Sequence, residues 1–292
     1  MNKEFFIGID ISKATLDSAV CRADSPDQFI QEQFANTVPG FKKLFGWLKK
    51  QGAQTTNSFL GMEHTGHFTL ALCCFLQQVE LSYTMISPLE LKRSMGLARG
   101  KNDRVDAMRI AQFTCLHQRL LKAVHLPSDS LLRLKNLMAF RDRLVKTRTS
   151  LKNAVGGLRE TSHLIDNTLI IRLSQKQIKL VEQQVAQTEK EMQATIKQDQ
   201  QLSDHFGLAK SVIGIGLVAA AAFLIHTQNF TVFDSGRQFA CYAGVAPFEH
   251  SSGSSVRGKT STSNLANKKT YATEMSVGVV STFRVNPPDY WT

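Results

Sequence analysis

The chain has 292 residues, of which 42% are hydrophobic and 20% charged, a balance that excludes a disordered protein and allows two or three domains. Lysine and arginine number 35 against 24 aspartates and glutamates, and the formal charge of +11 favours a polyanionic partner such as nucleic acid. The longest apolar stretches, LALCCFL and LVAAAAFLI, are too short to span a bilayer. We therefore expect a cytoplasmic protein with no membrane partner.

The first predicted element is a strand at 5–9, where a continuous apolar run indicates burial on both faces. Asp10 follows this run, and the partly apolar stretch at 16–20 can pair back on it as a hairpin. A lone aspartate at such a place is more often a turn former or a cap. The role of Asp10 therefore depends on whether other acidic residues are predicted to lie near it.

Strand and helix signals alternate from there to residue 120. Alternating residues predict a half-exposed strand at 29–34, and helical spacing predicts an amphipathic helix at 38–52. A second buried strand at 57–63, an apolar helix at 66–79 and a strand at 81–87 follow. This order describes a mixed sheet flanked by helices, an α/β fold.

Four acidic residues stand where such a sheet gathers functional groups. Asp10 and Glu63 each close a central strand, and Asp103 and Asp106 lie one turn apart at a predicted helix start. Taken singly, the helix pair is better explained as a solvated first turn, because acidic residues favour that end of the dipole. Taken together, four carboxylates need a divalent cation, and two magnesium ions about 4 Å apart are the usual reason in phosphoryl-transfer nucleases.

Basic residues around Asp103 and Asp106 strengthen the metal interpretation, because a nucleic-acid backbone needs positive charge beside the metal. They are Lys92, Arg93, Arg99, Lys101, Arg104 and Arg109. Lys101 and Arg104 are the closest in sequence, and we take them as candidates for direct contact with nucleic acid.

The segments GIDISKATLD, GMEHTGHF and GKNDRVDA resemble the three acidic motifs of the DEDD transposases of the insertion sequence 110 family. The resemblance implies that the N-terminal domain has the RuvC-like form of the ribonuclease H fold. It also implies that Asp10, Glu63, Asp103 and Asp106 are the catalytic tetrad and bind Mg²⁺ or Mn²⁺. The implied partners are element and target DNA and a structured guide RNA, in a bacterial, nucleoid-associated protein.

The middle of the chain predicts long helices, because residues 128–206 contain no proline and Gly156 and Gly157 form the only obvious break. Spacings of three and four indicate a coiled-coil seam made of Leu180, Val181, Val185, Thr188 and Met192. A solvated helical linker explains this segment about as well. The family resemblance implies a coiled-coil arm that brings protomers together as a homodimer or tetramer.

The third region begins with Gly214 and Gly216, which open an apolar helix in the manner of a helix-hairpin-helix turn. Backbone N–H groups of such a turn can hold a phosphate, although a tight turn before a core helix is the commoner explanation. Downstream, a loop rich in serine and glycine contains Arg257 and Lys259, which can contact nucleic-acid phosphates. A flexible linker is the plainer explanation of that loop.

The segment YAGVAPFEHSSGSSVRGK resembles the C-terminal transposase motif of the same family, in which a serine before a glycine attacks DNA. By that alignment the nucleophile is Ser252, with Ser251 as the adjacent rival. No Ser-His-Asp order is evident, so we expect activation by the metal cluster. The resemblance weakens after Lys269, as a truncated or frame-shifted tail would.

Three parts are expected on this basis: a RuvC-like catalytic domain at 1–127, a helical coiled-coil region at 128–207, and a mostly helical transposase domain with the serine loop at 208–292.

Three functions compete. The first is a DNA transposase or recombinase, and the second is a catalytically inactive nucleic-acid-binding remnant of a transposon, suggested by the C-terminal tail. The third is a sugar kinase or actin-like ATPase, whose phosphate hairpin resembles IGIDISKATLDSAV but normally has Gly-Thr or Gly-Ser after the aspartate. ATP binding would separate the third function from the others, and strand cleavage with magnesium would separate the first two.

Overall fold

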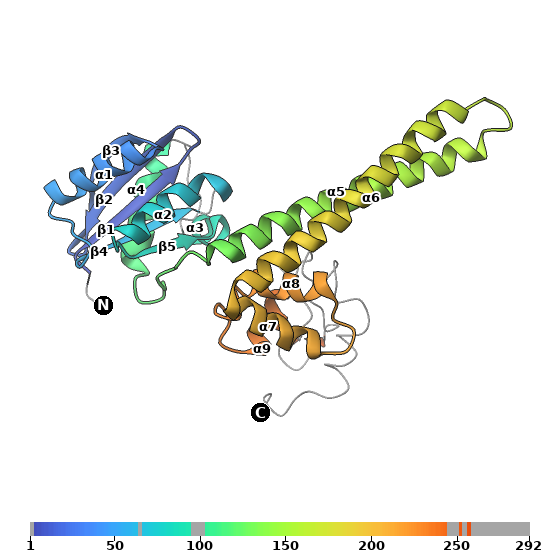
Figure 1. Cartoon of the computed structure of the whole chain (residues 1–292). Helices are drawn as coiled ribbons and strands as arrows, with labels where there is room; N and C mark the ends of the chain where they lie inside the picture. The colour runs from blue at the N-terminus through green and yellow to red at the C-terminus, as the bar shows by residue number, and fades with distance from the viewer. Residues whose placement is uncertain (1–2, 64–65, 95–102, 244–250, 253–255, 258–292) are drawn as a thin grey trace. The chain divides into compact units, whose positions relative to one another are not determined.

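The computed structural model describes residues 3–63, 66–94, 103–243, 251–252 and 256–257 (Figure 1). The chain divides into two compact units, Met1–Leu126 and Pro127–Thr292. Within the part of the chain that is described, each unit has hydrophobic clusters of its own. None of the helices described is both long and apolar enough to cross a membrane.

The first unit is built on a mixed sheet of five strands. They are β1 (Phe5–Ile11), β2 (Thr15–Arg22), β3 (Ser25–Ala35), β4 (Ser58–Glu63) and β5 (Tyr83–Ile86). The order in the sheet is β3-β2-β1-β4-β5, with β1, β2 and β3 antiparallel and with β4 and β5 parallel to β1. This is the strand order of the ribonuclease H fold, so the predicted fold class is confirmed. Asp10 lies at the end of β1, as expected, although the strand continues for one further residue to Ile11.

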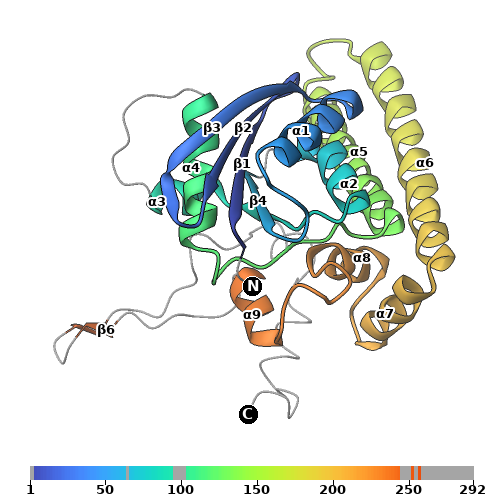
Figure 2. The same cartoon turned by 90° about the vertical axis from the view of Figure 1, so that its left-hand side faces the viewer.

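Helices cover both faces of this sheet. They are α1 (Val38–Lys50), the 3₁₀ helix η1 (Gly66–Thr69), α2 (Leu70–Gln78), α3 (Pro88–Ser94) and α4 (Asp103–Leu116). Helices α1 and α2 lie on one face and α4 lies on the other (Figures 1 and 2). Helix α1 begins where the sequence predicts, because the Thr37 side chain accepts a hydrogen bond from Gly40 N and proline occupies the first turn.

Two glycines let α4 lie directly on the sheet. Gly8 in β1 and Gly61 in β4 are neighbours in the parallel pairing. A Cβ atom on Gly8 would lie 2.2 Å from Ala111 N, and one on Gly61 would lie 2.0 Å from Thr114 Oγ1. Because only hydrogen fits at both positions, α4 is held close over β1 and β4, with its first turn near the ends of both strands.

We expect Gly8→Ala to lower the free energy of unfolding of the first unit by about 3 kcal/mol, because the new methyl group meets backbone atoms of α4 and not a flexible side chain. Thermal unfolding should show a lower melting temperature. Gly46→Ala is the matched control, since nothing lies within 4 Å of a Cβ there. Alanine in that exposed helix position should raise the stability by up to about 1 kcal/mol. A melting temperature unchanged by Gly8→Ala would contradict the close packing of α4.

The described part of the second unit consists of helices and a short hairpin. The helices are α5 (Asp129–Glu160), α6 (Thr168–Gln198), α7 (Gln200–Ser211), α8 (Leu217–His226) and α9 (Gly236–Ala243), and the hairpin strands are β6 (Ser251–Ser252) and β7 (Val256–Arg257). Helices α5 and α6 run antiparallel side by side (Figures 1 and 2), and we call residues 129–198 the arm. The helical arm and the mostly helical C-terminal part confirm the predicted fold class of this half.

The coiled-coil seam of the arm forms within one chain. Val181 and Val185 of α6 are buried in one cluster with Leu144 of α5. Ion pairs connect the two helices beside this seam: Arg133 with Glu191, Arg141 with Glu189 at 2.9 Å, and Lys152 with Glu182 at 2.7 Å. The seam predicted from the sequence is therefore covered by the neighbouring helix of the same protomer.

Two expectations for the arm are wrong. Leu180 is 55% exposed and does not belong to the seam, because it lies about 100° around the helix from Val181. The break expected at Gly156 and Gly157 does not occur, since α5 continues through both to Glu160. The chain turns at 161–167, where Asn167 Nδ2 donates to Leu158 O at 3.1 Å and so satisfies a carbonyl at the end of α5.

The start of α5 and the end of α6 share a hydrophobic core with α7 and α8. Its buried members are Leu131, Leu134, Met138, Met192, Ile196, Leu202, Ala221 and Leu224. The boundary expected at residue 207 therefore falls inside one compact unit. A separate coiled-coil region and C-terminal domain stay a prediction.

Candidate active site

Three elements bring the four predicted acidic residues to one end of the sheet. Asp10 lies in β1 and Glu63 is the last residue of β4, its parallel neighbour, so both carboxylates leave the sheet at the same end. Asp103 is the first residue of α4 and Asp106 follows one turn later. Because α4 packs on β1 and β4, its first turn lies near this end.

Asp10 lies within electrostatic range of the other three carboxylates. Burial raises the pKa of Asp10 to about 6, with further increases from the charges of Asp103, Asp106 and Glu63, while a hydrogen bond with the Ile11 backbone opposes the increase. A partly buried acid beside three other acids is a group whose charged form a cation would stabilise.

The carboxylates are near one another but do not enclose a metal position in the conformation described. Among the side chains placed by the structure, no three from His, Cys, Asp and Glu stand close enough to hold a metal ion. Asp106 instead pairs with Arg109 at 2.9 Å. A set of carboxylate oxygens nevertheless fits the hard cation that the family resemblance implies, Mg²⁺ or Mn²⁺.

Two side chains of β3 form hydrogen bonds with α4 and fix its position. Gln31 Nε2 donates to Arg104 O at 2.8 Å, in the first turn of the helix. Farther along, Gln112 Nε2 donates to Asp27 Oδ1 at 2.5 Å. These two bonds hold both halves of α4 against the edge of the sheet. The Arg104 side chain is exposed beside the acidic pair, and Lys101 lies outside the described residues.

A fifth acidic residue, Asp17, lies directly opposite Asp10 in the pairing of β1 with β2. It is 3% exposed, and Gln33 Nε2 donates to both of its carboxylate oxygens at 3.1 Å. Asp17 is not among the residues predicted from the sequence. A signal was present, because Asp10 and Asp17 are placed symmetrically about the predicted turn of the hairpin.

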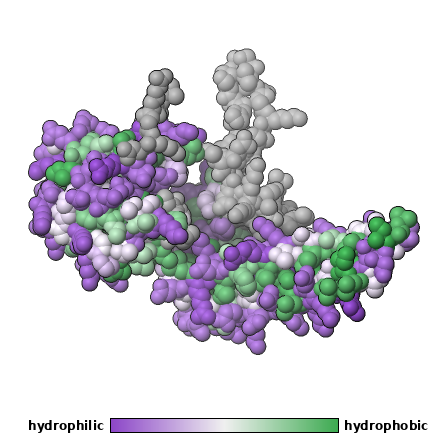
Figure 3. Space-filling view, turned by 90° about the horizontal axis from the view of Figure 1, so that it is seen from above, coloured by the Kyte–Doolittle hydropathy of each residue, from purple (hydrophilic) through white to green (hydrophobic). Residues whose placement is uncertain are grey.

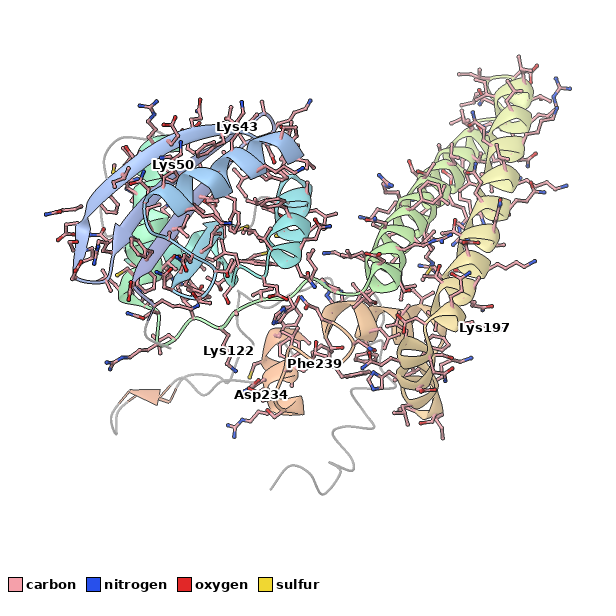
Figure 4. The ribbon with its side chains drawn as sticks, turned by 60° about the vertical axis from the view of Figure 1, so that its left-hand side comes forward. Lys43, Lys50, Lys122, Lys197, Asp234 and Phe239 are labelled. Atoms are coloured by element: carbon pink, nitrogen blue, oxygen red, sulfur yellow. The ribbon has the colours of Figure 1, made fainter. Side chains whose placement is uncertain are left out.

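The outer face of α1 is a second feature that the sequence analysis left out. Lys42, Lys43, Lys49 and Lys50 are all exposed. Their spacing of one, seven and eight residues places them on one face of the helix. Figure 4 labels two of them, Lys43 and Lys50. The lysine spacing is visible in the sequence segment FKKLFGWLKK, and a helix face lined with lysines can contact phosphates.

In the second unit, Gly214 and Gly216 lie in the turn between α7 and α8. Gly214 has a φ of 91°, which favours glycine, and Gly216 is the N-cap of α8 with no side-chain cap bond. Nothing lies within 4 Å of a Cβ built on either residue. Ile213 beside them is 91% exposed. The turn therefore presents open backbone and a free helix start, as the predicted phosphate contact requires.

The serine candidates lie in the hairpin of β6 and β7. Ser251 pairs with Arg257 in the register, and Ser252 pairs with Val256. Ser252 is thus the last paired residue before the three-residue connection 253–255. Lys259 lies outside the described residues.

Comparisons with known proteins match both halves of the chain. Residues 7–159 match the family model of the DEDD transposases of IS110, described as "Transposase". Residues 207–288 match a model described as "Transposase IS116/IS110/IS902 family". The second match runs beyond Lys269, so the resemblance continues past the point where the sequence analysis expected it to weaken.

Two similar proteins are the pilin gene-inverting proteins of Moraxella bovis and Moraxella lacunata. Each is 25% identical over 263 residues, which are 88% of this chain and 76% of the relative. Among solved structures, T. thermophilus RuvC in complex with a Holliday junction substrate is similar with a TM-score of 0.31 and 11% identity, over 41% of this chain and 99% of that chain. The fold assignment rests on the strand order and the family match, and not on this likeness.

Proposed function

The chain belongs to the IS110 family of DEDD transposases, since the family match at 7–159 covers more than half of it, and we propose that it cuts and rejoins DNA with four acidic residues and a serine. Members of this family are enzymes that act on DNA. The observation that carries the proposal is that β1, β4 and the first turn of α4 bring Asp10, Glu63, Asp103 and Asp106 to one end of the sheet.

Asp10, Glu63, Asp103 and Asp106 would hold Mg²⁺ or Mn²⁺. When bound, the metal supplies charge stabilisation at the scissile phosphate and lowers the pKa of an attacking hydroxyl. The chain's own residues orient the substrate. Arg104 beside the acidic pair and the exposed lysines of α1 can hold the phosphate backbone, and the Gln31 bond keeps the first turn of α4 in place.

Ser252 is the proposed nucleophile. Its Oγ forms a bond to phosphorus while the bond from phosphorus to a sugar oxygen breaks. The serine proton passes to a carboxylate or water, and the departing sugar oxygen takes up a proton to become a hydroxyl. The product is a phosphodiester between Ser252 and DNA, so one phosphodiester bond is exchanged for another. The reverse attack by a sugar hydroxyl can therefore rejoin DNA without an external energy source.

A structured RNA encoded by the element is the proposed guide. The family resemblance supports this, and the formal charge of +11 suits a protein that binds two polyanions at once. In RNA-guided recognition, base pairing reads the sequence while the protein contacts the backbone. The turn at Gly214 and Gly216, together with Arg257 and Lys259, would supply further backbone contacts.

The proposed function is tested with the purified chain, DNA bearing an element end, and RNA transcribed from the non-coding segment beside the gene. We expect strand-cleaved DNA with Mg²⁺ or Mn²⁺ and none after addition of EDTA, because the carboxylates need a cation to act on phosphate. Cleavage that persists in EDTA would contradict the metal assignment. DNA binding without cleavage would support the inactive remnant, and ATP hydrolysis without DNA would support the kinase-like alternative.

Assembly into a homodimer or tetramer is proposed to use the distal end of the arm. Large aliphatic side chains there are between 50% and 74% exposed: Leu164, Ile165, Leu169, Ile170, Leu173 and Leu180. Figure 3 shows hydrophobic surface gathered at this end of the arm. Leu169, Leu173 and Leu180 follow one line along α6, on a different side from the seam. A contiguous apolar surface of this kind marks an interaction site, and a second copy of the arm would cover it.

The double variant Leu169→Lys, Leu173→Lys is expected to weaken self-association by about a hundredfold or more, because two leucines lose burial of about 1.5 to 3 kcal/mol each. Light scattering over a concentration series measures this, and circular dichroism checks that the arm stays helical. Leu208→Lys is the control, since Leu208 is 67% exposed in α7 and outside the arm. An unchanged dimer in the double variant would contradict the proposed interface.

A further inference from the structure

Asn36, between β3 and α1, connects the turn that follows β1 with the helix that follows β4. Its backbone N–H donates to Ala14 O at 2.8 Å. Its side-chain Nδ2 donates to Ser12 O at 2.9 Å and to Phe68 O at 3.3 Å. Ser12 and Ala14 belong to the β1–β2 turn, and Phe68 belongs to η1. One side chain thus joins two segments that are far apart in the sequence.

The turn that Asn36 holds is organised by its own hydrogen bonds. Ser12 Oγ accepts from Thr15 N at 2.9 Å and from Ala14 N at 3.3 Å. The Ser12 backbone N–H also donates to Thr15 O at 2.9 Å. Because the turn is fixed internally, a bond to Ser12 O fixes the end of β1 as a whole.

The position of Asn36 matters because the pairing of β1 with β4 stops short of the carboxylates. The last paired residues are Ile9 and Met62, one residue before Asp10 and Glu63. Beyond that pair, the hydrogen bonds of Asn36 are the next link between the two segments among the residues described. Two carboxylates that repel each other would separate more readily without such a link.

The side-chain oxygen of Asn36 has no hydrogen-bond partner among the described residues. This oxygen, Oδ1, is buried. A buried acceptor without a partner destabilises a fold, and such groups in native proteins call for an explanation in function or strain. The two donor bonds also fix the orientation of the amide, since a flipped amide would set its oxygen against two carbonyl oxygens.

We propose that Asn36 is a positioning residue of the acidic site, which sets the separation of Asp10 and Glu63 through its bonds to Ser12 O and Phe68 O. The inference rests on the proposed function, in which these carboxylates bind a divalent cation. It predicts that removing the amide weakens metal binding without removing a metal ligand.

The experiment measures Mn²⁺ affinity of the full chain by electron paramagnetic resonance of free Mn²⁺. Asn36→Ala is expected to weaken the affinity about tenfold, as loss of an outer hydrogen bond to ligand segments does. Asn57→Ala is the matched control. Asn57 also cross-links backbone, accepting from Gln54 N at 2.7 Å and donating to Gly52 O at 3.2 Å, but it does so at the opposite end of the sheet. It should lower the melting temperature and leave the Mn²⁺ affinity unchanged.

A second readout separates positioning from general stability. Luminescence decay of bound Eu³⁺ in H₂O and D₂O counts the waters on the ion, and Asn36→Ala should add one as a carboxylate withdraws. Asn36→Ser, whose shorter side chain cannot span both carbonyls, should give the same result if the alanine variant does not fold.

The outcomes distinguish this inference from the proposed function. If the metal site is right, Asp10→Asn weakens Mn²⁺ binding whether or not Asn36 positions the carboxylates. If Asp10→Asn weakens binding and neither Asn36 variant does, the positioning role is overturned and the proposed function stands. If Asn57→Ala weakens Mn²⁺ binding as much as Asn36→Ala does, the positioning role is also overturned. If Asp10→Asn leaves Mn²⁺ binding unchanged, the metal site and the positioning role both fail.

Discussion

Asp10→Asn is expected to abolish DNA cleavage and, at neutral pH without metal, to raise the melting temperature of the protein. The amide keeps the shape of the side chain but loses the charge that binds a divalent cation. A loss of several kcal/mol of transition-state stabilisation corresponds to a rate lower by about a thousandfold or more. Activity and stability should therefore move in opposite directions.

The sign of the stability change follows from the pKa of Asp10, which is about 6 in the folded chain against 3.8 ordinarily. Because the folded state binds the proton more tightly, this contribution to stability is fully present below pH 3.8 and is lost as the pH rises through 6. Above that pH the carboxylate is charged, and burial, together with repulsion by Asp103 and Asp106, makes the charged form unfavourable. Asparagine carries no charge and avoids both effects, so the gain should be small at about pH 4 and full at about pH 7.5.

Thermal unfolding in EDTA across this pH range measures the effect, beside cleavage with Mg²⁺. Asp24→Asn is the control for the substitution itself. Asp24 is exposed, and its pKa is lowered by hydrogen bonding to Ser25 and by Arg22, so its removal should not stabilise the fold or change cleavage. A lower melting temperature of Asp10→Asn at neutral pH would contradict the raised pKa. Retained cleavage would contradict the acidic site.

Much of the first unit could be predicted because its signals are local. The apolar run at 5–9, the alternation at 29–34 and the helical spacing at 38–52 each coincide with an element of the structure. Strand β1 continues past the apolar run because Asp10 and Ile11 remain in the strand through pairing with β2. Hairpin pairing acts on polar residues as well, so a hydrophobicity pattern does not reveal it.

The pairing of the arm could not be predicted, because a seam with spacings of three and four looks the same whether its partner is in the same chain or in another. The turn at 161–167 has no glycine or proline and depends on side-chain bonds such as that from Asn167. Gly156 and Gly157 cost the helix only about 1 kcal/mol each, and packing along the arm outweighs that.

That Asp10, Glu63, Asp103 and Asp106 lie near one another could be predicted, since each stands at or near the end of an element that the sequence itself indicates. Their catalytic role stays a prediction. The burial of Asp17 beside Gln33 and the contacts of Asn36 could not be predicted, because both depend on register and on tertiary contact, although the hairpin itself indicates that Asp17 lies opposite Asp10. Asp17 needs the pairing of β1, β2 and β3, and Asn36 binds carbonyls 24 and 32 residues away. No local pattern marks a hydrogen bond over such a separation.

Ser252→Ala is expected to abolish a covalent protein–DNA product, whereas Ser251→Ala should retain it. In the hairpin, Ser252 is the last residue paired before the connection 253–255, opposite Val256, while Ser251 lies one step back opposite Arg257. A nucleophile has to approach phosphorus closely, and a glycine directly after Ser252 in the sequence favours such an approach. Arg257, five residues after Ser252 in the sequence, brings a positive charge that can neutralise a phosphate. The family motif and this register therefore favour Ser252.

The covalent product is measured by denaturing electrophoresis of labelled DNA after reaction with guide RNA and Mg²⁺, with and without protease. Wild type should give a slow band that protease removes, and Ser252→Ala should reduce it by about a thousandfold or more, because no other hydroxyl replaces the attacking oxygen. Binding of the same DNA should be unchanged in both serine variants, which shows that the loss is chemical. A product that survives Ser252→Ala and disappears in Ser251→Ala would move the nucleophile by one residue. A product that survives both substitutions would exclude covalent chemistry at this pair of serines.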